Sequence, residues 1–328
     1  MIFFEEDLKM KKLISLILVM LMVLSLAACG SDGPSKLTMG TGSTSGTYYA
    51  FGSILTQYFQ EHAGIAATPV STDGSKANIE FISTGDYQLG LVQSDVMTYA
   101  WQGSRSFESV GKIGSFRVVA GLYAEAVQLV TMDPAIKSVA DLKGKSVSIG
   151  APGSGVYFNA VDILAAAGLT EADINAQYQS FGDSADALKD GKIDAAFIVA
   201  GAPTAAITEL CVSNQAYLVP IDGDIAANLM ATSPFYTSYV IPAGTYDGQT
   251  EDVTTVTVKA TLICSADLSE ETVYNLTKAI FDHTDSIAAA NAKGKELSLE
   301  NATDGMSVPF HPGAAKYFAE AGITVDSQ

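Results

Sequence analysis

The sequence of 328 residues has little basic charge: 36 acidic residues stand against 18 lysines and arginines, and the formal net charge is -18. Nucleic acids and anionic lipid surfaces attract proteins through basic side chains, so this charge argues strongly against both as partners. Arginine is scarcest, since only Arg105 and Arg117 occur. Bidentate arginines are common clamps for carboxylates. Any carboxylate bound by this chain must therefore be met mainly by backbone amides and hydroxyl groups.

Histidine and cysteine are also few. His62, His283 and His311 are the only histidines, they form no zinc-binding spacing with cysteine, and we expect them at the surface or at helix ends. Cys211 and Cys264 lie in apolar segments, where a disulfide and a pair of buried free thiols are both compatible with the sequence. The sequence therefore predicts no metal site and no cofactor.

The N-terminal segment has the pattern of an export signal. Lys11 and Lys12 precede an apolar run that is too short to span a bilayer. The run ends in LAAC, which resembles the lipobox of bacterial lipoproteins and predicts lipidation at Cys29. We expect a signal peptide over residues 1–28, with Met10 as the true start, and a flexible tether over 29–36. The protein would then be lipid-anchored outside the cytoplasmic membrane, in a periplasmic space or on the outer face.

The remaining chain is long enough for two domains, and it repeats its own plan. The stretch GTGSTSGTYY, residues 40–49, joins a short strand to a helix expected over 47–62. The stretch GAPGSG, residues 150–155, joins the strand 146–149 to a helix expected over 156–167. The first loop looks like a phosphate cradle, but its glycine spacing matches neither nucleotide-binding fingerprint.

The repeat continues about forty residues after each loop. Buried strands are expected within 89–95 and 193–201, each preceded by a helix, over 75–83 and 184–189. Continuous apolar strands that alternate with helices predict parallel sheets covered on both faces. In such sheets the ligand lies beyond the carboxyl ends of the strands, so two such domains can share one cleft.

Two long strand patterns, 117–130 and 253–264, suggest connections that cross between the domains and form a hinge. We therefore predict an α/β fold of two similar domains with the ligand between them. The first domain would comprise residues 37–124 plus 253–328, and the second 125–252.

Several segments together resemble the TAXI family of extracytoplasmic solute receptors of tripartite ATP-independent periplasmic (TRAP) transporters. The resemblance covers residues 36–317 and rests on GTGS with GTYY, LVQSD at 91–95, SVADLKGK at 138–145, GAPGSG and IPAGTY at 241–246. It implies a type II-like periplasmic-binding-protein fold, delivery of a solute to a membrane permease driven by a cation gradient, and no catalysis. Some members of the family bind glutamate or glutamine, and dicarboxylates are suspected for others.

The first loop can present backbone N–H groups and hydroxyls to a carboxylate at the start of the following helix. The candidate residues are Gly42, Ser43, Thr44, Gly46 and Thr47. The alternative is a tight strand-to-helix turn with a hydroxyl cap. Three glycines exceed what a cap needs, so we favour ligand binding.

The second loop would supply the matching half of the site. Its candidates are Gly153, Ser154, Gly155 and Val156. Tyr48 and Tyr157 follow the two loops. Their side chains would either line the cleft or pack in the core.

Further candidates follow strands or begin helices. Gln93, Ser94 and Asp95 end a buried strand, where their polar groups either bind a ligand or cap the next helix. Glu125, at the first predicted crossing, would meet a ligand ammonium or make a hinge hydrogen bond. The remaining candidates are Thr72, Asp73 and Ser75 at a third helix start, where Asp73 either meets an ammonium or caps the helix, and Val199, Ala200 and Gly201 through their backbone groups.

We expect a monomeric receptor for a small carboxylated solute, with a zwitterionic head weakly favoured over a dianion. A receptor of the same fold that serves a sensor kinase or an ATP-driven importer is the alternative. An exported hydrolase would need a G-x-S-x-G elbow, whereas the loop reads PGSG at 152–155. The sequence therefore predicts no enzyme.

Overall fold

The computed structural model describes residues 36–213 and 215–327. The predicted signal peptide, the lipidation at Cys29 and nearly all of the tether lie outside these residues. No helix in the described ranges is long and apolar enough to cross a membrane.

The described strands are short except for two. They are β1 (Leu37–Gly40), β2 (Ala67–Val70), β3 (Leu89–Gln93), β4 (Phe116–Thr131), β5 (Ser146–Ser148), β6 (Asn175–Gln177), β7 (Ala195–Ala200), β8 (Tyr217–Val219), β9 (Thr237–Ile241) and β10 (Val253–Ser265).

The described helices cover the sheet. They are α2 (Thr47–Ala63), α3 (Ser75–Ser83), α4 (Ser94–Gln102), α5 (Val156–Ala166), α6 (Phe181–Lys189), α7 (Ala205–Ser213), α8 (Gly223–Thr232), α9 (Glu270–Phe281), α10 (Thr284–Ala290), α11 (Leu299–Thr303) and α12 (Pro312–Glu320). Short 3-10 turns lie at Arg105–Phe107, Val139–Leu142, Glu171–Asp173 and Ala292–Glu296.

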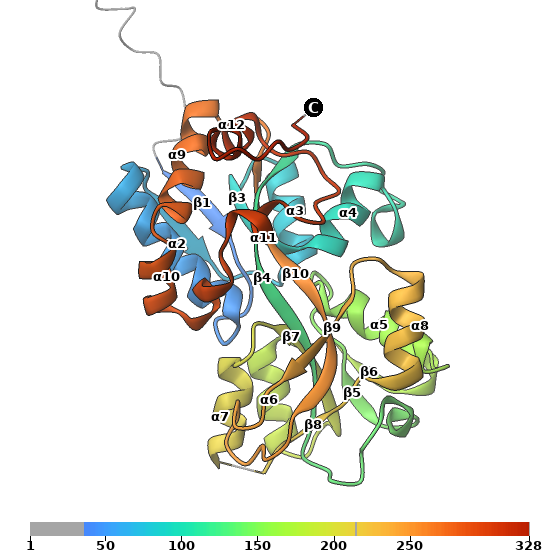
Figure 1. Cartoon of the computed structure of the whole chain (residues 1–328). Coiled ribbons are helices and arrows are strands. Elements are labelled where there is room, and N and C mark those ends of the chain that lie inside the picture. The colour runs from blue at the N-terminus through green and yellow to red at the C-terminus, as the bar shows by residue number, and fades with distance from the viewer. Residues whose placement is uncertain (1–35, 214, 328) are drawn as a thin grey trace, which may run out of the picture. The chain divides into compact units, whose positions relative to one another are not determined.

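The ten described strands form one sheet, in the order β2-β1-β3-β10-β4-β7-β5-β6, with β8 beside β4 and β9 beside β10. Strands β1, β2 and β3 pair in parallel, and so do β5, β6 and β7. The expected parallel sheets are thus present, but they are not separate. The antiparallel pair β4 and β10 joins them, because β10 pairs with β3 of the first set, β4 pairs with β7 of the second, and the two long strands pair with each other (Figure 1).

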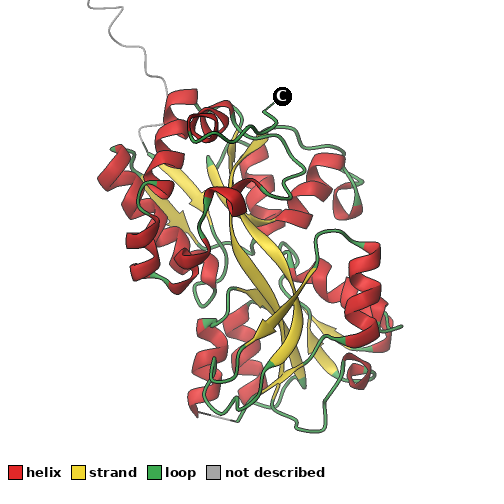
Figure 2. Ribbon diagram, in the orientation of Figure 1, coloured by secondary structure: helices red, strands yellow, loops and turns green. Residues whose placement is uncertain are grey.

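The buried side chains divide into two regions along these long strands. One cluster draws on residues 37–123 and 260–318, together with Phe158. Two others draw only on residues 126–258. We call the region with β1–β3, α2–α4 and α9–α12 the first lobe, and the region with β5–β9 and α5–α8 the second lobe (Figure 2). The exact domain limits stay a prediction.

Helix α2 illustrates how local sequence produces the packing. Phe51, Leu55 and Phe59 recur at helical spacing and are fully buried against the sheet. The helix ends at Gly64, whose φ of 68° is left-handed and whose N–H donates to the carbonyl of Phe59. The predicted helix over 47–62 is confirmed.

One predicted helix start is wrong. Helix α6 begins at Phe181, whereas the sequence reading placed its start at Ser184. The Ser180 side chain accepts a hydrogen bond from the Asp183 backbone N–H and caps the helix earlier than expected. Phe181, the first residue of the helix, lines the cavity described below.

Candidate functional site

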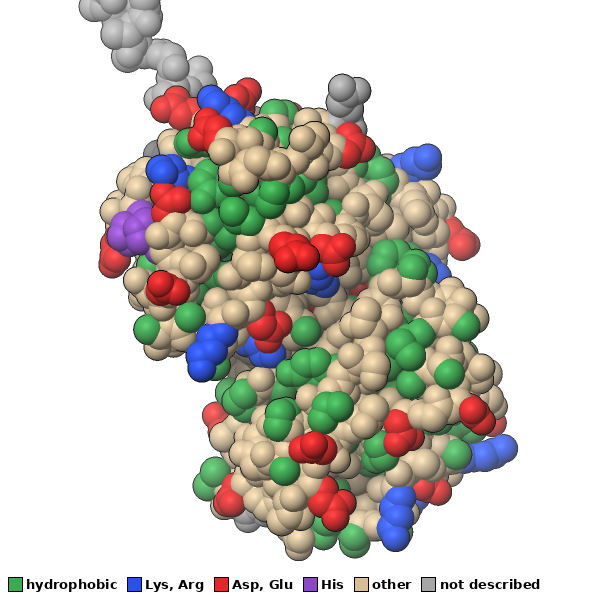
Figure 3. Space-filling view, viewed as in Figure 1, with side chains coloured by type: hydrophobic (Ala, Val, Ile, Leu, Met, Phe, Trp, Pro, Cys, Tyr) green, Lys and Arg blue, Asp and Glu red, His purple; other side chains and the backbone are tan. Residues whose placement is uncertain are grey.

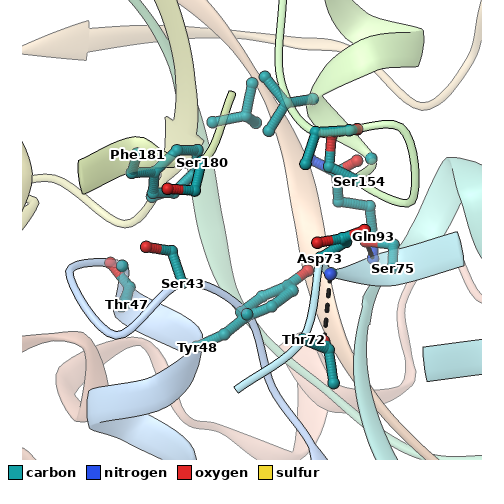
Figure 4. A pocket seen from close by; sticks show the side chains of 18 of the residues that line it. Ser43, Thr47, Tyr48, Thr72, Asp73, Ser75, Gln93, Ser154, Ser180 and Phe181 are labelled. Carbon is teal, nitrogen blue, oxygen red and sulfur yellow. Dashed lines mark hydrogen bonds between the residues drawn. The ribbon is translucent and has the colours of Figure 1, made fainter. Parts of the chain in front are cut away.

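A cavity lies between the two lobes where four helices begin. It has a volume of about 60 Å³, and its walls include the starts of α2, α3, α5 and α6. Figure 4 shows Ser43, Thr47 and Tyr48 on the first-lobe side, facing Ser180 and Phe181 from the second lobe, with Ser154 on a separate second-lobe loop near Gln93. This is the edge of the sheet where parallel strands end, which is where such folds bind ligands.

Three of the four helices start at a glycine. Gly46, Gly74 and Gly155 occupy the N-cap positions of α2, α3 and α5, and none supplies a capping side chain. No acidic residue occurs in the first turn of these three helices. The positive ends of their helix dipoles are therefore not neutralised by carboxylates of their own first turns, and they favour an anionic group in the cavity.

Carboxyl groups also line the cavity. The Glu125 side chain, on β4, is 2% exposed, and its Oε2 accepts a hydrogen bond of 2.6 Å from the Tyr48 hydroxyl. Burial raises the pKa of Glu125 to about 8, against the opposing effect of the Tyr48 hydrogen bond. Asp73 lines the same cavity from the start of α3. The cavity therefore offers partners for a cation as well as for an anion.

The lobes contact each other around the cavity. The Thr47 hydroxyl donates to the Gly201 carbonyl at 2.9 Å, and the Ala206 N–H donates to the Ser45 carbonyl at 3.2 Å. On the other side, the Ala77 N–H donates to the carbonyl of Gly153 at 3.1 Å. The structure is thus a closed arrangement of the lobes.

Most predicted site residues come together in this cavity. Those that line it are Gly42, Ser43, Gly46, Thr47, Tyr48, Thr72, Asp73, Ser75, Gln93, Glu125, Ser154, Gly155, Val156, Val199 and Ala200. Some of these polar groups are already used within the protein. The Thr72 hydroxyl accepts from the Gly74 backbone N–H and donates to Asn78 Oδ1. The Ser75 hydroxyl accepts from the Gln93 backbone N–H.

Five predicted residues do not line the cavity: Thr44, Ser94, Gly153, Tyr157 and Gly201. Thr44 is exposed at the tip of its loop. The Ser94 hydroxyl accepts from the backbone N–H of Lys259 at 3.4 Å. The Tyr157 ring turns toward its own lobe, where its hydroxyl donates to Glu171 at 2.9 Å.

Gly153 and Gly201 do not line the cavity but lie where the two lobes contact each other. A Cβ atom on Gly153 would lie 2.9 Å from the Asp73 Cβ, and one on Gly201 would lie 2.8 Å from the Cε of Lys293. Both distances are shorter than real Cβ contacts, so a side chain at either position requires its neighbour to shift. Their carbonyls accept the interlobe hydrogen bonds described above.

Five lining residues were not predicted from the sequence: Gly74, Ala151, Gln179, Ser180 and Phe181. Gln179 and Ser180 stand between β6 and α6 as Asp73 and Gly74 stand between β2 and α3, and Ser180, like Gly74, occupies the N-cap position. The repeat itself could have found them, but the misplaced start of α6 concealed the equivalence. Gly46 makes room for Phe181, since a Cβ there would lie 3.1 Å from the Phe181 ring.

The open questions about cysteine and histidine have structural answers. Cys211 and Cys264 are both buried free thiols, so they form no disulfide with each other. His283 and His311 occupy N-cap positions, and His62 lies in the last turn of α2. Within the described ranges no group of three or more potential metal ligands occurs.

Nothing in the cavity reproduces a hydrolase triad. The Ser154 hydroxyl donates to the Ala151 carbonyl at 2.7 Å, and no histidine is among the cavity-lining residues. This finding gives no support to the hydrolase alternative.

Comparison with solved structures identifies the fold. A protein from Bordetella bronchiseptica RB50 is 19% identical, with 87% of this chain and 89% of that chain covered and a TM-score of 0.54. PhnD1 from Prochlorococcus marinus (MIT 9301), solved in complex with methylphosphonate, is 12% identical, with coverage of 80% and 89% and a TM-score of 0.52. The fold is that of the periplasmic binding proteins.

The family is shown by a match over most of the length. A model of the NMT1-like family matches residues 39–322. The chain belongs to the NMT1-like family.

Proposed function

We propose that this protein is an extracytoplasmic solute receptor of a TRAP transporter, of the TAXI type. In this proposal it binds a small carboxylated solute with a zwitterionic head, glutamate- or glutamine-like, and delivers it to a cation-coupled permease. One observation carries the ligand class: glycine-capped starts of three helices and the buried carboxyl of Glu125 line one cavity. The anion partners and the cation partner of an amino acid are thus both available.

The carboxylate would lie at the helix starts. A single partly buried helix start contributes up to about 2 kcal/mol to binding an anion, so several together can replace an arginine clamp. Neither Arg105 nor Arg117 lines the cavity. This agrees with a carboxylate held by backbone N–H groups and hydroxyls of the two glycine-rich loops.

The ammonium would lie near Glu125. A buried carboxyl whose pKa is about 8 gives up its proton when a cation comes within hydrogen-bonding distance, because the charged form is then favoured. A diacid without an ammonium would instead give Glu125 no cation partner and bring a like charge toward Asp73. The cavity therefore favours a solute that carries an ammonium over the matching diacid that lacks it.

The cavity is small and is lined by both lobes, so a solute enters it when the lobes separate. Opening and closing would occur by bending of β4 and β10, with domain I as residues 37–124 plus 253–328 and domain II as 125–252.

Lipidation at Cys29 would keep the receptor, as a monomer, at the outer side of the membrane that holds the permease. The visible face in Figure 3 carries acidic side chains spread over both lobes, in keeping with a net charge of -18. The fold is compatible with an ATP-driven importer or a sensor kinase as partner as well. Genes next to this one that encode a polytopic permease without an ATPase would support the TRAP partner.

A thermal-shift screen of residues 36–328 against amino acids and matching dicarboxylates tests the ligand class. We expect stabilisation by one or more amino acids and a weaker effect from the corresponding diacids. Stabilisation by no carboxylate would contradict the proposal, and a preference for diacids would contradict its zwitterionic part. Isothermal titration of any hit then gives the affinity.

A further inference from the structure

A chain of hydrogen bonds runs from the protein surface to the cavity wall. At its outer end Arg105 Nη2 donates to Asp162 Oδ1 at 2.6 Å. The other oxygen of Asp162 accepts from the Tyr236 hydroxyl at 3.2 Å. Because the hydroxyl proton of Tyr236 is used toward Asp162, its oxygen is left as an acceptor.

Asn159, on α5, is the next member, and its orientation is determined by its neighbours. Its Nδ2 donates to the Tyr236 oxygen at 2.8 Å and to Asp95 Oδ2 at 3.0 Å. The side chains of Asn159 and Asp95 are fully buried. Turning the carboxamide over would place Asn159 Oδ1 against two acceptors and leave both without a donor, which is costly in a buried site.

Gln93, at the end of β3, contacts Asn159 across the lobe boundary, and this contact determines which way its carboxamide points. Its Nε2 donates to Asn159 Oδ1 at 2.9 Å, so its Oε1 occupies the opposite position. Gln93 is 2% exposed and lines the cavity, and its Oε1 has no hydrogen-bond partner in the described part of the chain. A buried carbonyl oxygen without a donor is unfavourable, so a partner from outside the protein is expected.

We propose that Asn159 is a positioning residue that commits the NH₂ group of Gln93 to itself and leaves the Gln93 oxygen, beside Gly155 in the cavity lining, as the acceptor for a solute. The wall at Gln93 therefore accepts a hydrogen bond from an N–H or O–H group and does not donate one. Gln179 adds a second buried carboxamide oxygen without a partner to the cavity lining. The proposal rests on the proposed function, because it takes for granted that a solute enters this cavity.

The charges around Gln93 indicate which solute group would donate the hydrogen bond to its oxygen. Glu125 and Asp73 line the same cavity, and Asp95 adds a third carboxyl behind Asn159. The Lys293 ammonium favours the charged form of Glu125 and itself donates to Glu296 at 2.7 Å. A solute ammonium satisfies these acceptors, and a second solute carboxylate does not. Gln93 thus selects amino acids over the same molecules without their amino group.

The binding test compares L-glutamate with glutarate, which lacks the ammonium, in four proteins: wild type, Gln93→Leu, Asn159→Leu and the double variant. Removing a hydrogen bond to a charged group should lower the preference for glutamate about tenfold or more in Gln93→Leu. Asn159→Leu should lower it as well, although Asn159 does not line the cavity. The double variant should match Gln93→Leu alone, because Asn159 acts only through Gln93. Independent, additive effects would overturn the proposal.

Asn301→Leu is the matched control. Its Nδ2 donates to two backbone carbonyls, Leu122 at 2.9 Å and Glu296 at 3.1 Å, and it does not line the cavity. It should leave the preference for glutamate unchanged. A loss of preference in Asn301→Leu as large as in Asn159→Leu would mean that the effect is general destabilisation, and it would overturn the positioning role.

A second measurement needs neither a ligand nor a folded variant at position 159. Gln93 Oε1 lies against the α-carbon of Gly155, since a Cβ on Gly155 would overlap it. In the wild-type protein without solute, the NH₂ protons of Gln93 should therefore show a weaker nuclear Overhauser effect to the Gly155 Hα protons than to the side-chain protons of Asn159, toward which Nε2 points. The opposite order of the two intensities would show the reverse orientation and overturn the inference. Failure of the wild type to bind any amino acid would instead contradict the proposed function and leave this readout valid.

Discussion

Gly155 and Gln93 touch across the boundary between the lobes, with no room for even a methyl group between them. Gly155 starts α5 in the second lobe, and Gln93 ends β3 in the first. The φ of Gly155 is -73°, which any residue adopts. A glycine is therefore needed there because Gln93 lies so close, and not because of the backbone conformation. The closed arrangement depends on this contact.

Gly155→Ala should therefore keep the lobes from closing while leaving each lobe folded. Forcing a methyl group into a packed contact costs about 1–3 kcal/mol. We expect Kd for the tightest-binding amino acid of the screen to rise about tenfold or more. Small-angle scattering should show a larger radius of gyration with the solute present than for the wild type under the same conditions.

Gly182→Ala provides the control for this variant. A Cβ at Gly182, in the first turn of α6, would meet only the Ser45 hydroxyl at 3.6 Å, an ordinary contact. Affinity and radius of gyration should equal those of the wild type. If Gly155→Ala behaves like Gly182→Ala, the closed contact has no part in binding.

Glu125 should make the solute-free protein less stable as the pH rises. Its folded pKa of about 8 lies above the ordinary value of 4.5, so the folded state holds the proton more tightly. The resulting stability is complete below pH 4.5 and is lost as the pH rises to about 8. Between pH 5.5 and 8.5 the free energy of unfolding should fall by roughly 3 kcal/mol from this group. Denaturant unfolding at several pH values measures it.

Glu125→Gln should remove most of this dependence, because a carboxamide still accepts from the Tyr48 hydroxyl but cannot ionise. The variant should be more stable than the wild type at pH 8.5 and similar at pH 5.5. A smaller decline should persist from Asp95, whose pKa burial raises to about 7. Parallel pH curves for the two proteins would contradict the assignment of the buried proton to Glu125.

Binding of an amino acid at pH 7 should release a proton from Glu125. The carboxyl is mostly protonated without solute and becomes charged beside the ammonium. Titration calorimetry in buffers of different ionisation enthalpy should show proton release in the wild type and much less in Glu125→Gln. Proton uptake, or the same release from both proteins, would be incompatible with an ammonium at this position.

The Thr47 hydroxyl, which donates to the Gly201 carbonyl across the boundary, should contribute to the closed state. Thr47→Val removes this buried hydrogen bond, worth about 0.5–1.5 kcal/mol, and should raise Kd about two- to tenfold. Thr56→Val is the control, since that hydroxyl, also buried in α2, donates to the Ser53 carbonyl within the helix. Equal effects of both substitutions on Kd would assign the loss to the helix itself.

The sequence predicted the parts of the site that follow from local pattern. Two strand, loop and helix units with glycine-rich loops were readable because their glycine spacing and helical periodicity lie within short segments. The second-lobe residues 179–181 were missed because the start of α6 was predicted at Ser184, whereas its N-cap is Ser180.

Side-chain direction was not readable. Tyr48 and Tyr157 follow the two loops at corresponding places, yet the Tyr48 hydroxyl reaches Glu125 and the Tyr157 hydroxyl reaches Glu171. Which partner each ring finds depends on the packing of distant segments. The bond from Gln93 to Asn159 likewise joins residues 66 apart in the sequence, and no periodicity indicates such a pair.

The unequal composition of the two lobes has a consequence for the order in which the molecule can fold. The buried clusters of the second lobe use only residues 126–258, a continuous segment of chain. The core of the first lobe needs residues 260–318 as well as 37–123. During synthesis or export, the core of the first lobe therefore cannot form completely until the last fifth of the chain is present. Its buried cluster stays incomplete until then, so this lobe exposes apolar surface for longer than the second lobe does.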